Sequence, residues 1–315
     1  MGSAPATSGD RFSPLSGIGN TPLIQLRRVI AQSGAKVFLK LEYHNPTASY
    51  KDRMAIAVIE GAERSGALRP GMRVLEFTGG STGSSLAMVC AVKGYKFIAV
   101  SSDAFAKEKL MTIRAFGGDL HIVPSDGGKI TPEIFTQMKA ETARLAGDPD
   151  IFYADQFNNP DVPIGYSGLG VELLDKLPTI DVFTASVGTG GMLVGVSRVL
   201  KAKNPNTRVI ALEPASAPLL SQGTKGSHRV EGIGVGFVPP HLSRHDYDEA
   251  MAIEEGEARQ MARALAKQEG VFAGTSTGLN VVAATKIAAN MGPEQVVVTV
   301  AADGGFKYLA GDLYA

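Results

Sequence analysis

The sequence predicts an α/β fold with two lobes, in which helices cover both faces of parallel sheets. Short β-branched runs alternate with longer stretches of helical periodicity along most of the 315 residues, and such alternation is typical of parallel sheets. A hydrophobic content of 44% allows a substantial buried core. A turn-rich segment at residues 147–150 separates two series of strands and indicates a lobe boundary.

The expected elements follow from local pattern. Apolar, β-branched runs of four to seven residues predict strands, and apolar residues at helical spacing predict helices. The strands are expected at residues 37–41, 73–77, 97–100, 120–123, 181–185, 208–212 and 296–300. The helices between them are expected at residues 107–116, 133–145, 192–203, 257–268 and 279–289.

Charge and cysteine content exclude several classes of function. The 31 basic and 31 acidic side chains cancel, which argues against a nucleic-acid or membrane-surface partner and leaves a small molecule as the default ligand. Cys90 is the only cysteine, so the chain has no internal disulfide and no cysteine-rich metal site. The five histidines form no spaced cluster, and no metal is expected.

Targeting and membrane signals are also missing from the sequence. Residues 1–10 are small and polar and lack the charged start and apolar stretch of a signal peptide. The longest apolar strand candidate, residues 296–302, is too short to span a bilayer. We therefore expect a soluble, cytoplasmic protein.

Lys51 is the most informative single residue. Residues 45–53 are typical of a polar loop leading into an amphipathic helix, so Lys51 falls in or near the first helical turn. The positive end of the helix dipole disfavours a cation there by up to about 1 kcal/mol. A lysine that gives up its proton easily is a nucleophile suited to Schiff-base chemistry with an aldehyde cofactor or a carbonyl substrate. The alternative is a solvated lysine whose charge is offset by Asp52.

Two loops rich in glycine and hydroxyl groups follow predicted strands. Residues 78–83 and 186–192 each precede a helix, so their backbone amides and the helix dipole can bind an anion. Neither loop has the Lys-Ser or Lys-Thr pair of a Walker motif, and Leu193 occupies the third glycine position of a dinucleotide fingerprint. The alternative for each loop is a tight turn that needs glycine for its geometry.

Several segments, in one order, carry a resemblance that covers most of the chain. They are Gly19-Asn20-Thr21-Pro22-Leu23, Ser49-x-Lys51, Thr78-Gly79-x-x-Thr82-Gly83, Gln156-Phe157-x-Asn159-Pro160, Gly188-Thr189-Gly190-Gly191, Gly232 to Phe237 and Gly274-x-Ser276-x-Gly278. This order resembles the cysteine synthase and cystathionine β-synthase family. Those proteins are pyridoxal-phosphate enzymes of the tryptophan-synthase-like fold, also called fold type II.

The resemblance implies a role for each motif. Lys51 would hold pyridoxal 5'-phosphate as a Schiff base and later remove the substrate's α-proton. Ser276 would face the pyridine nitrogen, where a hydroxyl makes the ring a weaker electron sink than a carboxylate would. The cofactor's phosphate would be bound by Gly188, Thr189, Gly190, Gly191 and Met192. The substrate's carboxylate would be bound by Thr78, Gly79, Gly80, Ser81, Thr82 and Gln156, with Gly232 in a loop that flanks the cofactor.

The chain also departs from the family pattern. Many members carry Ser-Gly-Asn where this chain has Gly79-Gly80-Ser81, so Ser81 replaces an asparagine that reaches the cofactor's ring hydroxyl. Met192 stands where a threonine often ends the phosphate-binding loop. The first change puts the usual sulfhydrylase substrate in doubt, whereas backbone contacts to the phosphate would survive the second.

The resemblance implies two domains and a reaction at Cβ of an amino acid. The smaller domain would span residues 45–150, and the larger cofactor domain residues 11–44 with 151–315. The leading hypothesis is β-replacement on O-acetylserine or O-phosphoserine by sulfide or another thiol, in a homodimer. One alternative is β-elimination, as in a cysteine desulfhydrase or a serine/threonine dehydratase. The other is a non-catalytic homologue that senses amino acids.

Overall fold

The computed structural model describes residues 10–31, 34–127 and 132–315. Contacts between Cα atoms divide the chain into two units. The first unit contains the described residues up to Ile18 together with Asn45–Gly165, and the second contains Gly19–His44 and Tyr166–Ala315. Each unit is described by itself.

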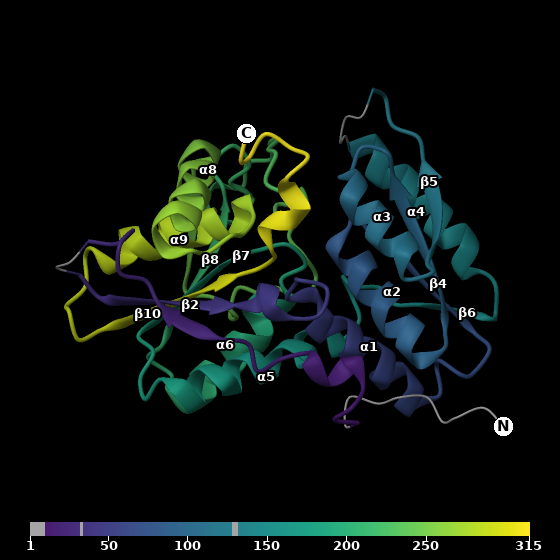
Figure 1. Ribbon diagram of the computed structural model, residues 1–315, viewed down its shortest axis with the longest axis horizontal. Coiled ribbons are helices and arrows are strands. Elements are labelled where there is room, and N and C mark those ends of the chain that lie inside the picture. Colours follow the sequence, from purple (N-terminus) through teal and green to yellow (C-terminus); the bar gives the residue numbers. More distant parts are fainter. Residues whose placement is uncertain (1–9, 32–33, 128–131) are drawn as a thin grey trace. The chain divides into compact units, whose positions relative to one another are not determined.

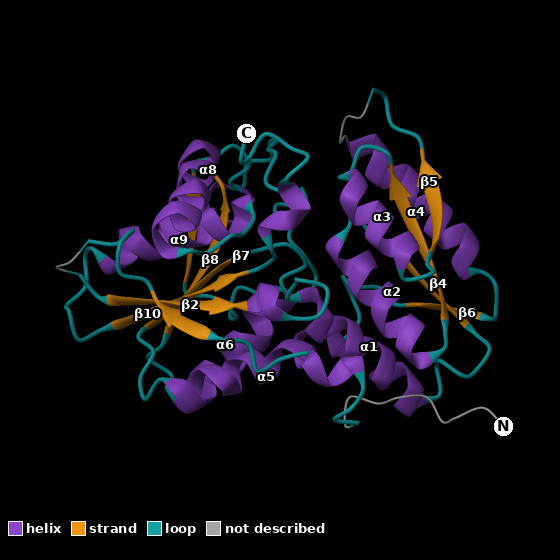
Figure 2. Ribbon diagram, viewed as in Figure 1, coloured by secondary structure: helices purple, strands orange, loops and turns teal. Residues whose placement is uncertain are grey.

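A four-stranded parallel sheet forms the centre of the first unit (Figure 2). Its strand order is β5-β4-β3-β6. The interior of β3 is buried on both faces of the sheet, since the neighbouring residues Val74 and Leu75 are both fully inaccessible, as is typical of parallel sheets between helices. The strands are β3 (Arg73–Phe77), β4 (Lys96–Ser102), β5 (Asp119–Val123) and β6 (Ile151–Tyr153).

Helices pack against this sheet and against one another. Helix α4 contacts β3 and β4 and contributes Ile134 and Met138 to a core that also contains Leu75 and Ile98. Helix α2 packs on β4 and contacts both α1 and α3. The helices are α1 (Lys51–Ser65), α2 (Ser81–Lys93), α3 (Lys107–Ala115) and α4 (Pro132–Ala146), and a 3-10 turn, η1, covers Pro14–Gly17.

A six-stranded sheet in the order β1-β2-β10-β7-β8-β9 forms the centre of the second unit. Strand β1 at one edge is antiparallel to β2, and the other neighbouring strands pair in parallel. The strands are β1 (Leu23–Gln25), β2 (Lys36–Leu41), β7 (Val182–Ser186), β8 (Arg208–Pro214), β9 (Glu249–Ile253) and β10 (Val296–Ala301).

Helices α8 and α9 lie on one side of this sheet and α6 on the other (Figure 1). Helix α9 packs on β10 and β7, and its close contact with α8 requires Gly278, because a Cβ there would lie 1.9 Å from the Ala258 carbonyl oxygen. The helices are α5 (Asp161–Lys176, which begins in the first unit), α6 (Gly191–Lys203), α7 (Leu219–Gln222), α8 (Glu255–Ala264) and α9 (Thr275–Ala288). Shorter turns are η2 (Glu42–His44), η3 (Leu265–Glu269) and η4 (Gly305–Tyr308).

The predicted fold class is confirmed, with differences at the ends of elements. Strands β1, β6 and β9 were not expected, because they are three to five residues long and mostly half-buried. Helix α9 begins at Thr275 rather than at Leu279, so Ser276 lies in its first turn and not in a preceding loop. Residues 11–18 and 151–165 belong to the first contact unit, whereas the sequence placed them in the larger domain. No helix among the described residues is long and apolar enough to cross a membrane.

Candidate active site

Lys51 is the first residue of α1, as the sequence predicted. Its side chain is buried, with 6% of its surface exposed, and Nζ lies 4.6 Å from the centre of the Tyr50 ring. The neighbouring Asp52 carboxylate accepts hydrogen bonds from the backbone N–H of Thr47 at 2.8 Å and from its hydroxyl at 2.5 Å. The burial of Lys51 contradicts the alternative of a solvated surface lysine.

The loop between β3 and α2 is organised by the hydroxyl of Thr78. Its Oγ1 accepts hydrogen bonds from the backbone N–H groups of Gly80 at 3.0 Å and Gly83 at 3.3 Å. Helix α2 begins at Ser81, and its N-cap residue is Gly80, which has no side chain to accept a hydrogen bond from the first amides. Within the described parts of the chain, the amides of Ser81 and Thr82 have no hydrogen-bond acceptor. Uncapped amides at a helix N-terminus fit a carboxylate.

Gly79 and Gly80 leave space that side chains of α3 and its preceding loop fill. A Cβ on Gly79 would lie 2.8 Å from Cε1 of Phe105, and a Cβ on Gly80 would lie 2.3 Å from Cδ of Lys109. Gly80 also has a φ of 150°, which side-chain-bearing residues rarely adopt. The departure at Gly79 is therefore matched by the ring of Phe105, whereas the stem of the buried Lys109 fills the space beside Gly80, a position where the family pattern also has glycine. Neither neighbour was identified from the sequence.

Gln156 lies against this loop although it is 74 residues further along the chain than Thr82. The hydroxyl of Thr82 donates to Oε1 of Gln156 at 2.7 Å, and Nε2 of Gln156 donates to the Phe77 carbonyl at 3.1 Å. The segment before Lys51 also reaches α2, since Oγ1 of Thr47 lies 3.2 Å from Oγ of Ser85. The first unit thus brings together Gln156 and the predicted substrate-binding loop of residues 78–82, whereas Gly232 lies in the second unit.

The predicted phosphate loop of the second unit connects β7 to α6. Helix α6 begins at Gly191, one residue before the predicted start, and its N-cap residue Gly190 has a φ of 82° and makes no side-chain cap. Thr189 and Met192 are buried. The backbone amides of residues 189–192 find no hydrogen-bond acceptor among the described residues. This arrangement fits a phosphate group, which uncapped amides and the helix dipole both stabilise.

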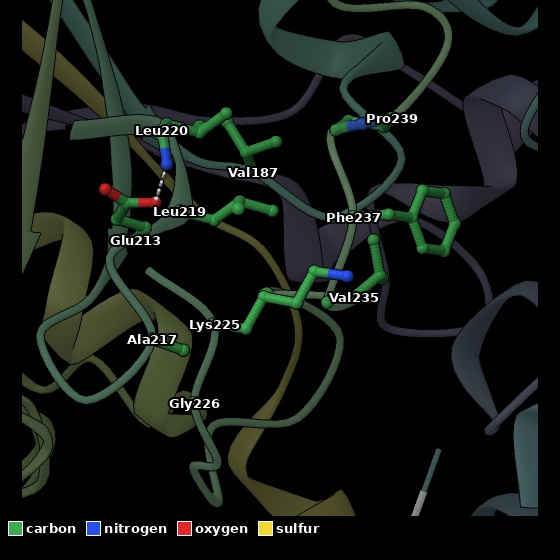
Figure 3. Close-up of a pocket in the computed structure, with 13 residues that line it drawn as sticks. Val187, Glu213, Ala217, Leu219, Leu220, Lys225, Gly226, Val235, Phe237 and Pro239 are labelled. Carbon is green, nitrogen blue, oxygen red and sulfur yellow. Dashed lines mark hydrogen bonds between the residues drawn. The ribbon is translucent and has the colours of Figure 1, made fainter. Parts of the chain in front are cut away.

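Gly188 allows the loop that contains Gly232 to approach. A Cβ at position 188 would lie 2.3 Å from the Gly232 carbonyl oxygen, so only glycine permits this contact. The N–H of Gly234 donates to the Val187 carbonyl at 3.0 Å and joins the two loops. A small pocket of about 20 Å³ lies beside them, and the Lys225 side chain points toward Val235 and Phe237 at its edge (Figure 3).

Ser276 is held in the first turn of α9. It is buried, and its helix is anchored by Asn280, whose Oδ1 accepts from the Ser186 backbone N–H at 2.8 Å and whose Nδ2 donates to the Val300 carbonyl at 2.8 Å. Asn280 therefore fixes the position of Ser276 relative to the end of β7, where the phosphate loop begins. Asp303 lies beside Gly274 and accepts from the hydroxyl of Tyr308 at 2.7 Å.

Comparison with known proteins agrees with this arrangement. A family model described as pyridoxal-phosphate dependent enzyme matches residues 15–303. A cysteine synthase of Staphylococcus aureus strain Mu50 is 40% identical over 95% of this chain and 95% of its own length.

Solved structures give the same picture. O-acetylserine sulfhydrylase isoform 3 of Entamoeba histolytica is 34% identical, with a TM-score of 0.88 over 99% of this chain and 95% of that one. A hydrogen sulfide-producing enzyme of Fusobacterium nucleatum is 34% identical, with a TM-score of 0.87 over 95% and 99% of the two chains. The chain belongs to the pyridoxal-phosphate-dependent enzyme family. Within this family it is cysteine synthase-like.

Proposed function

We propose that this enzyme catalyses β-replacement on a serine derivative, O-acetylserine or O-phosphoserine, with sulfide or another thiol as the nucleophile. One observation carries the proposal. The buried Lys51 lies in the same unit as a helix N-terminus whose amides fit a carboxylate and whose loop contacts Gln156. The similarity to a cysteine synthase and to an O-acetylserine sulfhydrylase supports it.

The residues have separate tasks in this reaction. Lys51 would hold the cofactor through Nζ, and the same amine would serve as the base for the proton on the substrate's Cα. The amides and hydroxyls at positions 78–82, with Gln156, orient the substrate's carboxylate. When bound, pyridoxal phosphate stabilises negative charge at Cα so that the leaving group can depart from Cβ.

The second unit supplies the residues proposed to hold the cofactor. The loop of residues 188–192 binds the phosphate through backbone amides, and Gly232 lies beside it. The hydroxyl of Ser276 would lie on the side of the cofactor's pyridine nitrogen, where a hydroxyl rather than a carboxylate would favour loss of a Cβ substituent over chemistry that needs a long-lived carbanion. Ser81, at the start of α2, offers a hydroxyl in place of the usual asparagine amide.

β-Elimination is a second candidate function. It is supported by the similarity to a hydrogen sulfide-producing enzyme and by the altered loop at Gly79, Gly80 and Ser81. Elimination would release the substrate's carbon skeleton as pyruvate with ammonia, whereas replacement would yield cysteine. The two reactions share the residues described above.

Product analysis with O-acetyl-L-serine, with and without sulfide, tests the proposal. We expect cysteine in the presence of sulfide and little pyruvate, and we expect no turnover by Lys51→Ala. Lys36→Ala is the matched control, because Lys36 is an exposed lysine paired with Glu294. Pyruvate formation that sulfide does not change would reject replacement in favour of elimination.

Oligomeric state and location stay predictions. We propose a homodimer on the basis of family resemblance, and the exposed apolar side chains of Phe12 and Ile164, 85% and 60% accessible in the single chain, are compatible with a subunit contact. We also propose a cytoplasmic location.

A further inference from the structure

Glu76 is a carboxyl group inside an otherwise apolar stretch of β3. Its side chain is completely buried. Each carboxyl oxygen accepts one backbone hydrogen bond, Oε1 from the N–H of Phe77 and Oε2 from the N–H of Gln156, both at 2.9 Å. The two donors lie at the start of the substrate loop and at the residue that contacts it from the far side.

These bonds continue into the predicted carboxylate site. Gln156 donates through its side chain to the Phe77 carbonyl and accepts from the hydroxyl of Thr82. A closed network therefore runs from Glu76 to Gln156 and back to β3 through the Phe77 carbonyl, and Thr82 joins it by donating to the Gln156 side chain. Asp155, just before Gln156, has a left-handed backbone with a φ of 49°, and a conformation of this kind persists only where the surroundings hold it.

Burying a carboxyl group at this position costs free energy of folding, because the group loses its contacts with water. An apolar side chain of similar size would avoid this cost. Burial is the largest influence on Glu76 and raises its pKa to about 8, while the two backbone donors and the charge of Lys51 lower it and Asp155 raises it. Tyr153 is the other ionisable group that interacts with Glu76. The carboxyl group offsets this cost by accepting two backbone hydrogen bonds, which an apolar side chain could not do.

We propose that Glu76 is a positioning residue, which holds Gln156 and the loop of residues 78–82 in the geometry that binds the substrate's α-carboxylate. It touches neither substrate nor cofactor and acts through the two backbone N–H groups. This inference rests on the proposed function, since it assumes an amino-acid substrate at this loop.

The test compares Glu76→Leu, which removes both acceptors, with Glu76→Gln, which keeps one. We expect the apparent Kd of O-acetyl-L-serine, measured from the change in the visible spectrum of the holoenzyme, to rise about tenfold or more in Glu76→Leu. Glu76→Gln should fall between this variant and the wild type. Deuterium exchange at the amide of Gln156 should become faster in the same order.

Glu63→Leu is the matched control, because Glu63 lies in the same unit and pairs with Lys93 and Tyr95 away from the loop. It should lower stability while leaving the Kd and the exchange at Gln156 unchanged. A Kd in Glu76→Leu equal to that of the wild type would overturn the proposal. If the spectrum of the wild type does not respond to O-acetyl-L-serine, that compound is not the substrate. The exchange rate of the Gln156 amide in Glu76→Leu would then be the test of the role of Glu76.

The wild type also provides a test that needs no variant to fold. The amide of Gln156 should exchange as slowly as the amides of the neighbouring strand β3, because a buried acceptor holds it. Exchange as fast as that of exposed loop amides would contradict the role of Glu76.

Discussion

At the scale of single residues, burial rather than local pattern separates functional from structural side chains. The sequence placed Lys51 at a helix start but left open whether it is solvated, and the structure answers this question with a buried side chain. Glu76 could have been noticed as a charged residue inside an apolar strand. Its partner Gln156 is 80 positions away, so the hydrogen bond between them could not be predicted without the fold.

Phe105 and Lys109 illustrate the same limit. The replacement of Ser-Gly-Asn by Gly79-Gly80-Ser81 was recognised as a departure from the family pattern and interpreted as extra space. The structure shows that the ring of Phe105 and the stem of Lys109 fill this space. A sequence shows a missing side chain, but it does not show which neighbour takes its place.

The buried carboxyl of Glu76 predicts a pH dependence of stability. Its pKa is raised from 4.5 to about 8, so between these values the folded protein holds a proton that the unfolded chain has lost. The free energy of unfolding should therefore decrease as the pH rises through this window, by on the order of a few kcal/mol from this group.

Urea unfolding of the wild type and of Glu76→Gln across pH 4.5 to about 8 measures this effect. Other titrating groups contribute equally to both proteins, so the difference between the two curves isolates Glu76. We expect the wild type to lose its stability relative to the variant as the pH rises. Parallel curves would show that Glu76 titrates at the same pH in the folded and unfolded chains.

At the scale of elements, the two predicted anion sites lie at the N-termini of helices α2 and α6, which begin after Gly80 and Gly190. These glycines have no side chain that could accept a hydrogen bond, and at α2 the hydroxyl of Thr78 accepts instead from the amide of Gly83. The glycine-rich loops were recognisable in the sequence. The exact start of each helix was harder to recognise, because hydroxyl residues and glycines occur both in the first helical turn and in the preceding loop.

Gly188→Ala tests the phosphate loop as an element. The added methyl group would lie 2.3 Å from the Gly232 carbonyl oxygen, so one of the two loops must move. We expect the Kd of pyridoxal phosphate, measured by titrating the apoenzyme and following the visible band, to rise about tenfold or more.

Gly256→Ala is the control for this substitution. Gly256 lies in α8 of the same unit, and a Cβ there would have no neighbour within 4 Å. It should bind the cofactor as the wild type does. Equal affinity of both variants would show that the close approach of the two loops has no part in phosphate binding.

At the scale of the whole molecule, alternation of strands and helices was enough to predict two sets of parallel strands and the fold class. The antiparallel edge strand β1 and the short strands β6 and β9 were missed, because edge and half-buried strands lack a continuous apolar run. The extent of each unit depends on long-range contacts, and residues 151–165 show that turn-rich sequence alone does not mark a boundary.

The central claim is that Lys51 holds pyridoxal phosphate for chemistry on an amino acid. The most direct measurement is the visible spectrum of the purified protein, before and after borohydride, with mapping of the reduced adduct and then addition of O-acetyl-L-serine to untreated protein. We predict a visible band that borohydride abolishes, an adduct on Lys51, and a spectral shift with the amino acid. A protein that stays colourless after incubation with pyridoxal phosphate, or an adduct on another lysine, would contradict the account.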